Sequence, residues 1–424
     1  MPAAARALPP VAGLALAIVG ALALSACSLV DRGGQDADSA DSVAAEVELP
    51  AADQPASPVL VADGAAGSGG TESGQLADDG AAARPVVPTS TVPVLTGWAA
   101  FDASLRDEIL GGGSQALSVA VAINGELVHE EAFGRQTPET LEPADVDDRF
   151  RVASISKTIT AITVMQFVED GLIGLDEPVG ARIAEYVGIA NPSERASAIT
   201  VRQLLTHTSG FPQSQSVFFS NRVWACPQAA AAGLTGPIGG NGYDYSNMNY
   251  CVLGMLLEQL TGQRYEEIVY ERLLTPLGIS GMRIAPTYDP GPGEIEHYTT
   301  EGRNYMEALG GAGAWVATAG DIVTILDSLD LSTPGWKPLT APSVAMMRAS
   351  GTGGGDRGYG MGLLLYGGGV HGHTGTLEST HAMVLNRNDG VTWAVLVAGS
   401  TPSESSNLRA MVDRAFAAGG FVFA

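Results

Sequence analysis

The sequence predicts an α/β fold in which an antiparallel sheet, built from both ends of the folded part of the chain, is flanked by helices and carries a mostly helical subdomain inserted in the middle. Three observations lead to this prediction. An early hairpin pattern spans residues 117–133, four strand-like segments lie between residues 359 and 398, and the stretch 172–298 has mostly helical periodicity. Strands separated in this way, with helices between them, favour one sheet assembled from both termini.

The first residues are expected to form an export signal. They carry one positive charge, Arg6, then an apolar run over residues 11–24, and they end in Leu24-Ser25-Ala26-Cys27. The small residues before Cys27 resemble a bacterial lipobox, which implies cleavage before Cys27, diacylation of its sulfur and tethering to the outer face of a membrane. An uncleaved membrane anchor is the alternative, but a run of about 14 residues is short for a span of about 20.

Residues 28–96 are predicted to be a disordered tether. They show no apolar periodicity and hold 11 acidic against 2 basic residues, so they cannot bury enough apolar surface to offset the entropy of ordering. Pro85, Pro88 and Pro93 stiffen its end. The expected organisation is therefore a lipoprotein signal peptide over 1–26, the lipidated cysteine and acidic tether over 27–96, and a folded domain over 97–424.

The net charge argues against some classes of partner, and the number of cysteines argues against one class of fold. A formal charge of -24 and a pI near 4.4 argue against nucleic acid or an anionic membrane surface as partner. Three cysteines are too few for a disulfide scaffold. Once Cys27 carries lipid, Cys226 and Cys251 remain, and an exported pair of this kind is expected to form a disulfide, with two buried free thiols as the alternative.

The folded part should open with a helix and a hairpin. Phe101, Leu105 and Ile109 recur at helical spacing before a run of three glycines. The alternating residues of 117–123 then lead to Asn124-Gly125, a type I′ turn signal, and a second strand returns over 127–133.

The next helix should begin at Ser154 and end at Gly171, with its isoleucines on the buried side. In the helical middle, His207 lies between threonines ahead of a Ser-Gly turn, and we expect a hydrogen-bonded structural histidine there rather than a catalyst. Tyr245 and Asn247 occupy the turn before an apolar helix that ends at Gly262.

The last third is expected to return to the sheet. A glycine-rich segment, 310–320, leads into a helix from Asp321. The segments with strand character and the closing helix follow in the order 359–366, 370–376, 381–386, 391–398 and 406–418.

Ser154 and Lys157 are the candidate catalytic pair, because a serine and a lysine three residues apart at a helix start share one face. Only two of the 22 basic residues are lysine, Lys157 and Lys337. An amine desolvated in a cleft can take a proton from a hydroxyl, whereas a guanidinium cannot. A surface lysine one turn along a helix is the alternative.

Three motifs stand in order along the chain: Ser154-Ile155-Ser156-Lys157, Tyr245-Ser246-Asn247 and His373-Thr374-Gly375. Together they resemble the penicillin-recognising serine hydrolases, in the branch of class C β-lactamases, D-alanyl-D-alanine carboxypeptidases and esterases. The resemblance covers residues 97–418 and includes 204–210 and 310–321. It implies a β-lactamase/transpeptidase-like fold without a cofactor or a metal.

The resemblance also implies roles. Ser154 would be the nucleophile that forms an acyl-enzyme, and Lys157 and Tyr245 would move its proton to the leaving group, which requires a lowered pKa for each. Asn247 would hold the lysine amine and the substrate amide, next to the substrate-binding residues His373, Thr374 and Gly375. The backbone N–H groups of Ser154 and Thr376 would form the oxyanion hole.

The third motif departs from the family's β-lactamases, which mostly have lysine where this chain has His373; histidine there is similar to some carboxypeptidases and esterases. This makes efficient β-lactam hydrolysis doubtful. If His373 reads a substrate carboxylate, it does so only when protonated, which for a free imidazole means below about pH 6.5.

Alternatives remain open at this point. The substrate could be a peptidoglycan stem peptide, a β-lactam, a D-amino-acid amide or an ester. His371, His373 and His381 could belong to a metal hydrolase, although no carboxylate partner pattern accompanies them. A binding module without turnover would also keep the fold, while an α/β-hydrolase is disfavoured because no Gly-x-Ser-x-Gly occurs.

Overall fold

The computed structural model describes residues 96–213, 215–220 and 222–422. The predicted export signal, Cys27 and the acidic tether lie outside this part of the chain. Among the described residues, no helix combines the length and the apolar character that crossing a membrane requires.

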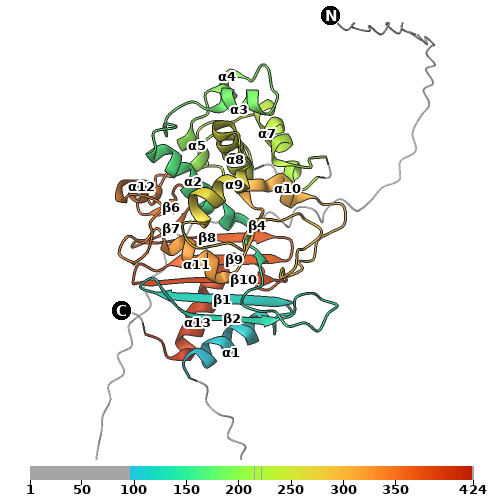
Figure 1. The fold of residues 1–424 in the computed structure, drawn as a ribbon, viewed down its shortest axis with the longest axis vertical. Coiled ribbons are helices and arrows are strands. Elements are labelled where there is room, and N and C mark those ends of the chain that lie inside the picture. Colours follow the sequence, from blue (N-terminus) through green and yellow to red (C-terminus); the bar gives the residue numbers. More distant parts are fainter. Residues whose placement is uncertain (1–95, 214, 221, 423–424) are drawn as a thin grey trace, which may run out of the picture. The chain divides into compact units, whose positions relative to one another are not determined.

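The described residues contain a seven-stranded antiparallel sheet in the order β2-β1-β10-β9-β8-β7-β6 (Figure 1). Its strands are β1 Ala116–Ile123, β2 Glu126–Gly134, β6 Arg357–Tyr359, β7 Leu364–Gly367, β8 Val370–Leu377, β9 Thr380–Asn386 and β10 Val391–Ala398. The β1–β10 pair joins strands from the start and the end of the folded part. The predicted sheet assembled from both ends is therefore confirmed.

The hairpin β1–β2 forms as the sequence predicts. Asn124 and Gly125 both have positive φ, 52° and 82°, which a type I′ turn requires. The one predicted strand over 359–366 is wrong, because it divides into β6 and β7. Gly362 turns the chain there with a φ of 74°, and a Cβ on it would lie 2.4 Å from the Cβ of Ala161.

Two helices cover one face of the sheet. Helix α1 (Trp98–Ile109) presents Phe101, Leu105 and Ile109, and α13 (Leu408–Gly419) packs beside it. The larger core lies on the other face, where small residues of β1 and β10 leave room for α11 (Ala319–Asp327), and it also includes α2 (Ser156–Glu169). The predicted first, catalytic and closing helices are thus present.

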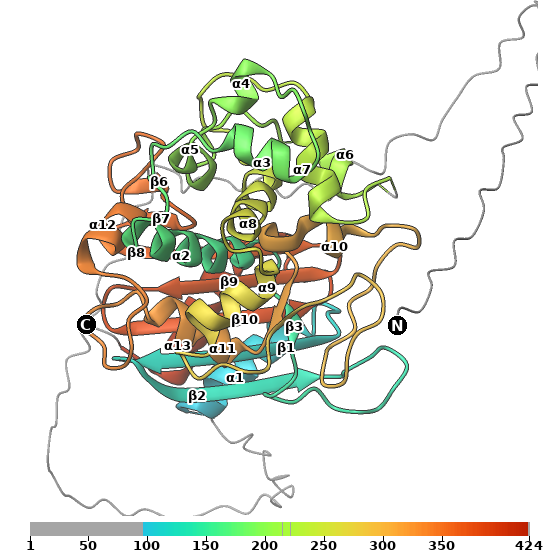
Figure 2. The ribbon, with the colours of Figure 1, turned by 45° about the horizontal axis from the view of Figure 1, so that its top comes forward.

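The helical middle gathers beyond the β8 side of the sheet (Figure 2). Its helices are α3 Gly180–Tyr186, α4 Glu194–Ser197, α5 Val201–Leu205, α6 Gln215–Phe218, α7 Cys226–Thr235, α8 Asn247–Thr261, α9 Tyr265–Val269 and α10 Tyr305–Leu309, and α12 Ala341–Met347 lies nearer the β6–β7 hairpin. Short turns of other helical types are η2 Ala153–Ile155, η3 Tyr270–Leu274, η4 Gly310–Ala312 and η5 Ser405–Asn407.

A second, three-stranded sheet has no counterpart in the sequence analysis. Its strands, in the order β3-β5-β4, are β3 Phe150–Arg151, β5 Trp315–Ala317 and β4 Arg283–Ile284. Strand β3 leads directly into η2 and α2, so this small sheet fixes where α2 begins.

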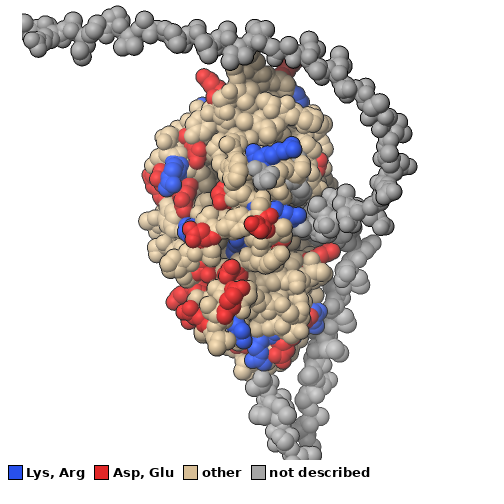
Figure 3. Space-filling model, turned by 90° about the vertical axis from the view of Figure 1, so that its right-hand side faces the viewer, with Lys and Arg blue, Asp and Glu red and all other residues tan. Residues whose placement is uncertain are grey.

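On the face shown in Figure 3, acidic side chains (red) are interspersed with basic side chains (blue). From Gly97 onward the chain has 35 acidic and 19 basic residues, a formal charge of -16.

Candidate active site

Ser154 is the only partly exposed residue between Phe150 and Phe167; every other residue in this described stretch is buried. It lies in the turn η2, rather than in the first turn of α2 as the sequence suggested. Ala153 before it has a φ of 48°, a strained conformation for a residue with a side chain. The backbone conformation at Ala153 therefore leaves Ser154 partly exposed in an otherwise buried segment. Ser156, in contrast, is fully buried, and its Oγ accepts a hydrogen bond from the Trp315 backbone N–H at 3.3 Å.

Lys157 lies directly behind Ser154. Its side chain is fully buried, and its Nζ is 2.9 Å from Ser154 Oγ, 2.7 Å from Asn247 Oδ1 and 2.7 Å from the Ala312 carbonyl oxygen. No carboxylate pairs with it among the described residues. Burial therefore lowers the pKa of the Lys157 amine well below its ordinary value.

These contacts match an uncharged amine. A neutral amine has two N–H donors and one lone pair. Asn247 Oδ1 and the Ala312 carbonyl oxygen can only accept, so they take the two N–H groups. The lone pair is left for the Ser154 hydroxyl proton. The structure thus brings the predicted serine, lysine and asparagine together, and it adds the Ala312 carbonyl of η4, which the sequence analysis missed.

Tyr245 completes this group from the turn before α8. Lys157 Nζ lies 4.9 Å from the centre of its ring, and its hydroxyl is buried without a hydrogen-bond partner among the described residues. Burial raises the pKa of the Tyr245 hydroxyl well above its ordinary value, and the nearby Ser154 hydroxyl opposes this rise only in part. The expectation that both pKa values are lowered is therefore wrong for Tyr245.

His207 holds the turn that carries Tyr245. Its carbonyl oxygen accepts a hydrogen bond from the Asp244 N–H at 2.9 Å, and its Nδ1 accepts one from the Ser246 N–H at 3.1 Å. The two residues flanking Tyr245 are thus bound by one buried histidine. Burial lowers the pKa of His207 well below its ordinary value. These contacts agree with the predicted structural role.

Strand β8 brings the third motif to the same place. A Cβ on Gly375 would lie 2.2 Å from the Val152 carbonyl oxygen, so only glycine lets β8 approach the segment before Ser154 so closely. Strand β7 pairs only with the first residues of β8, up to Gly372, which leaves the following edge uncovered by a strand in the described fold. Thr374 and Thr376 are partly exposed along this edge.

His373 does not match the expectation of a histidine that titrates near pH 6.5. Its side chain is fully buried, its Nε2 lies 3.1 Å from the Tyr359 hydroxyl, and its Nδ1 lies 2.6 Å from the Thr374 carbonyl oxygen. Burial, with a smaller effect of Lys157, lowers the pKa of His373 to about 3. His373 is therefore neutral at physiological pH, and the idea of a charged carboxylate reader is corrected.

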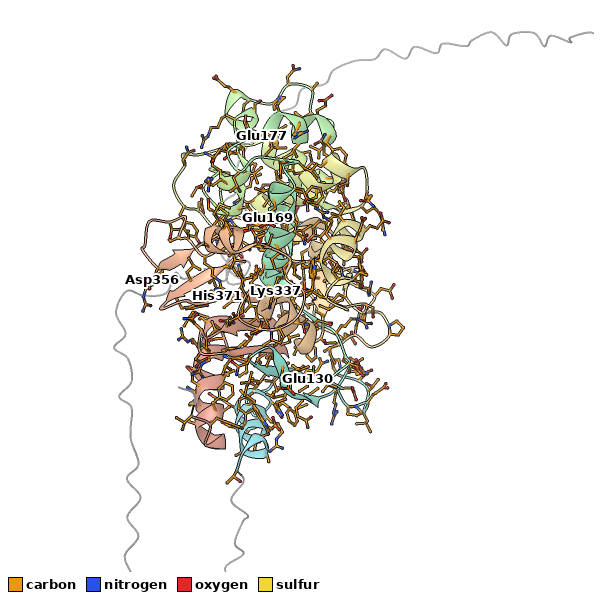
Figure 4. All side chains as sticks on the ribbon, turned by 60° about the vertical axis from the view of Figure 1, so that its left-hand side comes forward. Glu130, Glu169, Glu177, Lys337, Asp356 and His371 are labelled. Carbon is orange, nitrogen blue, oxygen red and sulfur yellow. A yellow bond between two sulfur atoms is a disulfide. The ribbon has the colours of Figure 1, made fainter. Side chains whose placement is uncertain are left out.

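The three histidines of the metal hypothesis are engaged separately. His371 Nδ1, on β8 (Figure 4), lies 2.8 Å from the Gly369 carbonyl oxygen, and His381 Nδ1 lies 3.2 Å from Ser405 Oγ. Within the part of the chain that the structure describes, no three histidine, cysteine or acidic side chains are grouped to hold a metal ion.

Cys226 and Cys251 are paired in a disulfide, with Cα atoms 5.7 Å apart. The bond ties the first residue of α7 to the first turns of α8, close to Asn247. In a Cys27→Ser protein, reduction is expected to lower the free energy of unfolding by roughly 3 kcal/mol, because the bridge closes a loop of moderate length. Urea unfolding with and without reductant measures this. Two thiols that react in the unfolded, unreduced protein would contradict the pairing.

The fold is a large antiparallel sheet with a helical insertion, and a serine–lysine pair lies where α2 begins. Together these features define a β-lactamase-fold serine hydrolase. A family model described as Beta-lactamase matches residues 101–418. The chain belongs to the Beta-lactamase family.

Similar curated proteins include Penicillin-binding protein 4* of Bacillus subtilis strain 168, which is 27% identical over 194 residues, 43% of this chain and 40% of that protein. Protein flp of Staphylococcus aureus strain N315 is 21% identical over 235 residues, 54% of this chain and 47% of that protein. The matched part of the chain spans less than half the length of both relatives.

Solved structures support the fold. SurE with D-Leu is 26% identical, with a TM-score of 0.60 and coverage of 77% of both chains. The D-amino acid amidase from Ochrobactrum anthropi SV3 complexed with L-phenylalanine amide has a TM-score of 0.62 at 22% identity, covering 76% of this chain and 97% of that one. The octameric penicillin-binding protein homologue from Pyrococcus abyssi has a TM-score of 0.62 at 20% identity, covering 76% and 77%.

Proposed function

We propose that the protein is a serine acyl hydrolase that forms an acyl-enzyme on Ser154 and acts on the carbonyl of a D-amino-acid residue in a peptide or an amide. One observation carries the proposal. Ser154, the one partly exposed residue of an otherwise buried segment, lies 2.9 Å from the amine of a fully buried lysine that has no carboxylate partner in the described fold.

In the first step, Ser154 Oγ attacks the substrate carbonyl carbon and its proton passes to Lys157 Nζ. The amine accepts this proton because burial favours its neutral form before the reaction. The resulting ammonium then has two acceptors already in place, since Asn247 Oδ1 and the Ala312 carbonyl oxygen each lie 2.7 Å from Lys157 Nζ. The negative oxygen of the tetrahedral intermediate lies next to the proposed N–H groups of Ser154 and Thr376.

In the second step, Tyr245 gives its hydroxyl proton to the leaving amine as the carbon–nitrogen bond breaks, and Lys157 returns a proton to Tyr245. This order follows from the two pKa shifts, which have opposite directions. The lowered pKa of Lys157 leaves its amine free to accept a proton, and the raised pKa of Tyr245 keeps its hydroxyl protonated. Water then hydrolyses the ester on Ser154 by the same groups in reverse, which releases the acid and restores the enzyme.

The choice of a D-amino-acid residue rests on similarity. The matched structures include SurE with D-Leu and the D-amino acid amidase from Ochrobactrum anthropi SV3. An esterase of the same fold is the alternative. The test compares the D and L forms of one amino-acid amide and of the corresponding ester. Hydrolysis of the D-amide supports the proposal, and hydrolysis of the ester alone, without preference between D and L, would replace it by the esterase.

The pH dependence follows from the burial of His373. For a peptide that ends in a carboxylate and its amidated twin, the ratio of kcat/KM values is expected to stay flat from about pH 5.5 to 8.5, a window around the free imidazole value. His373 has a pKa of about 3, so its neutral form persists throughout. The shared ionisations of Lys157 and Tyr245 cancel in the ratio. The contradicting result is a fall in kcat/KM of the carboxylated peptide, relative to that of its amidated twin, as the pH rises through about 6.5. That result would mean that His373 is charged below this pH and binds the carboxylate.

We also propose that the protein is an extracytoplasmic lipoprotein, held at the membrane by lipid on Cys27. The support is the sequence before Cys27, which lies outside the described residues. A Cys27→Ser protein is expected to leave the membrane fraction, while the unchanged protein stays there and incorporates labelled fatty acid. Equal membrane retention of both proteins would contradict the lipid anchor.

A further inference from the structure

The turn η4, whose Ala312 carbonyl accepts a hydrogen bond from Lys157, is also bound by a second side chain of α2. Thr160 lies three residues after Lys157, so the two side chains share one face of the helix. Lys157 Nζ lies 2.7 Å from the Ala312 carbonyl oxygen, and Thr160 Oγ1 lies 2.7 Å from the carbonyl oxygen of the preceding residue, Gly311. Two consecutive carbonyls of η4 are therefore bound by neighbouring residues of one helix face.

Thr160 is in turn bound by Tyr265, the first residue of α9. The Tyr265 hydroxyl lies 2.7 Å from Thr160 Oγ1, and Trp315 Nε1 donates a hydrogen bond to it at 3.0 Å. Thr160 and Trp315 are fully buried, and Tyr265 is nearly so. A Cβ on Gly311 would lie 3.1 Å from both Thr160 Oγ1 and Tyr265 Cζ, so these two side chains also pack directly against η4.

The direction of these hydrogen bonds follows from the protons that each group has. The indole N–H of Trp315 can only donate, so the Tyr265 oxygen accepts from it. Burial raises the pKa of Tyr265 to about 12, so its hydroxyl keeps its own proton and donates it to Thr160 Oγ1. Thr160 then donates to the Gly311 carbonyl oxygen, which is nearer than the Ser156 carbonyl oxygen at 3.1 Å. One chain of hydrogen bonds thus runs from Trp315 to η4.

The position of η4 matters because the Ala312 carbonyl takes one of the two N–H groups of the neutral Lys157 amine. Asn247 Oδ1 takes the other, which leaves the lone pair for the Ser154 hydroxyl. An amine rotates about a single bond, so losing either acceptor lets the lone pair turn away from the nucleophile. A misplacement of about 1 Å in such a group can lower the rate by about 100-fold.

We propose that Thr160 is a positioning residue that holds the Ala312 carbonyl in place and thereby directs the lone pair of Lys157 toward the nucleophile. Tyr265 acts one step further away, because it fixes the hydroxyl of Thr160. This inference rests on the proposed function, since it concerns the proton transfer from Ser154.

Thr160→Val keeps the shape of the side chain and removes its hydroxyl. For a D-amino-acid amide and the corresponding ester, kcat/KM is expected to fall by roughly 10- to 100-fold. Thr160→Ser restores the hydroxyl and should recover most of the loss. Thr163→Val is the matched control, because Thr163 is also fully buried in α2 but donates to the Ile159 carbonyl oxygen of its own helix at 3.0 Å. Its kcat/KM should stay within about threefold of the wild type, since one hydrogen bond away from the site is lost.

Tyr265→Phe is the second variant, in case Thr160→Val folds poorly. It keeps the hydrogen bond from Thr160 to Gly311, so the expected loss in kcat/KM is smaller, about fivefold. Because the two residues belong to one chain of hydrogen bonds, Tyr265→Phe should cause no further loss when Thr160 is already valine. Losses that multiply in the double variant would contradict the chain.

A nuclear magnetic resonance measurement separates this inference from the proposed function, because it does not depend on turnover. The chain has only two lysines, so isotope-labelled lysine gives two sets of side-chain signals, and Lys337→Arg identifies those of Lys157. At neutral pH the Lys157 signals should shift in Thr160→Val and in Tyr265→Phe, return in Thr160→Ser and stay in place in Thr163→Val.

Unmoved Lys157 signals in Thr160→Val, or an equal loss of activity in Thr163→Val, would overturn the inference. If the wild type hydrolyses neither the amide nor the ester, the proposed function fails. The Lys157 signals alone then decide the inference: it stands if they shift in Thr160→Val and not in Thr163→Val, and it falls otherwise.

Discussion

Replacing Lys157 by arginine is expected to reduce kcat/KM by roughly 10⁴-fold, the upper end of what general-base catalysis contributes. The guanidinium keeps much of the length, but it stays protonated at any working pH, so it brings a charge into the site and cannot take the proton of Ser154. It also brings five N–H donors to a buried site where two acceptors, Asn247 Oδ1 and the Ala312 carbonyl oxygen, suit one amine. Steady-state hydrolysis of an activated D-amino-acid ester measures the effect.

The chain provides its own control, because Lys337 is its only other lysine. This residue follows α11 and is labelled in Figure 4; its Nζ donates to Thr333 Oγ1 at 2.7 Å. Lys337→Arg makes the same chemical change outside the site and is expected to leave kcat/KM within about twofold, since this partly exposed residue contacts none of the candidate catalytic groups. Near-original turnover by Lys157→Arg would remove the lysine from the proton transfer.

Replacing Tyr245 by phenylalanine is expected to lower kcat/KM by roughly 10²- to 10³-fold for an amide, within the usual range for a general acid. The expected loss is smaller for an activated ester, whose leaving group needs no proton. Folding should change little, because the Tyr245 hydroxyl has no hydrogen-bond partner in the described fold. The measurement is kcat/KM for an amide and an ester of the same D-amino acid.

Tyr243→Phe is the matched control. The Tyr243 hydroxyl is also buried without a partner among the described residues, and its ring also packs against Tyr359. Both variants remove the same kind of atom from the same cluster, so only a role in proton transfer distinguishes them. Equal activity of the two variants on the amide would rule out Tyr245 as the proton donor.

Most of the architecture could be predicted because its signals are local. The hairpin over β1 and β2 follows from alternation and an Asn-Gly turn, and α8 ends at Gly262, whose φ is 73°. The small sheet of β3, β5 and β4 was missed because two- and three-residue strands are too short to show a period. The division of β6 from β7 depends on contact between Gly362 and α2, which the sequence alone does not reveal.

The candidate active site could also be predicted from the sequence only in part. The three motifs contain the residues that meet around Ser154, but the Ala312 carbonyl lies 155 positions from Lys157 and carries no side-chain signal. The direction of each pKa shift also depends on burial, which is a property of the folded chain. Burial lowers the pKa of Lys157, raises that of Tyr245 and keeps His373 neutral, and only the first of these was expected.

The central claim is that Ser154 becomes covalently acylated, and the mass of the protein after exposure to a fluorescent penicillin tests it most directly. A saturating amount should add one equivalent to the wild type, and peptide mapping should place it on Ser154. Ser156→Ala, which changes the buried serine of the same motif, should still be labelled, whereas Ser154→Ala should not. An adduct on any other residue, or one that persists in Ser154→Ala, would contradict the account.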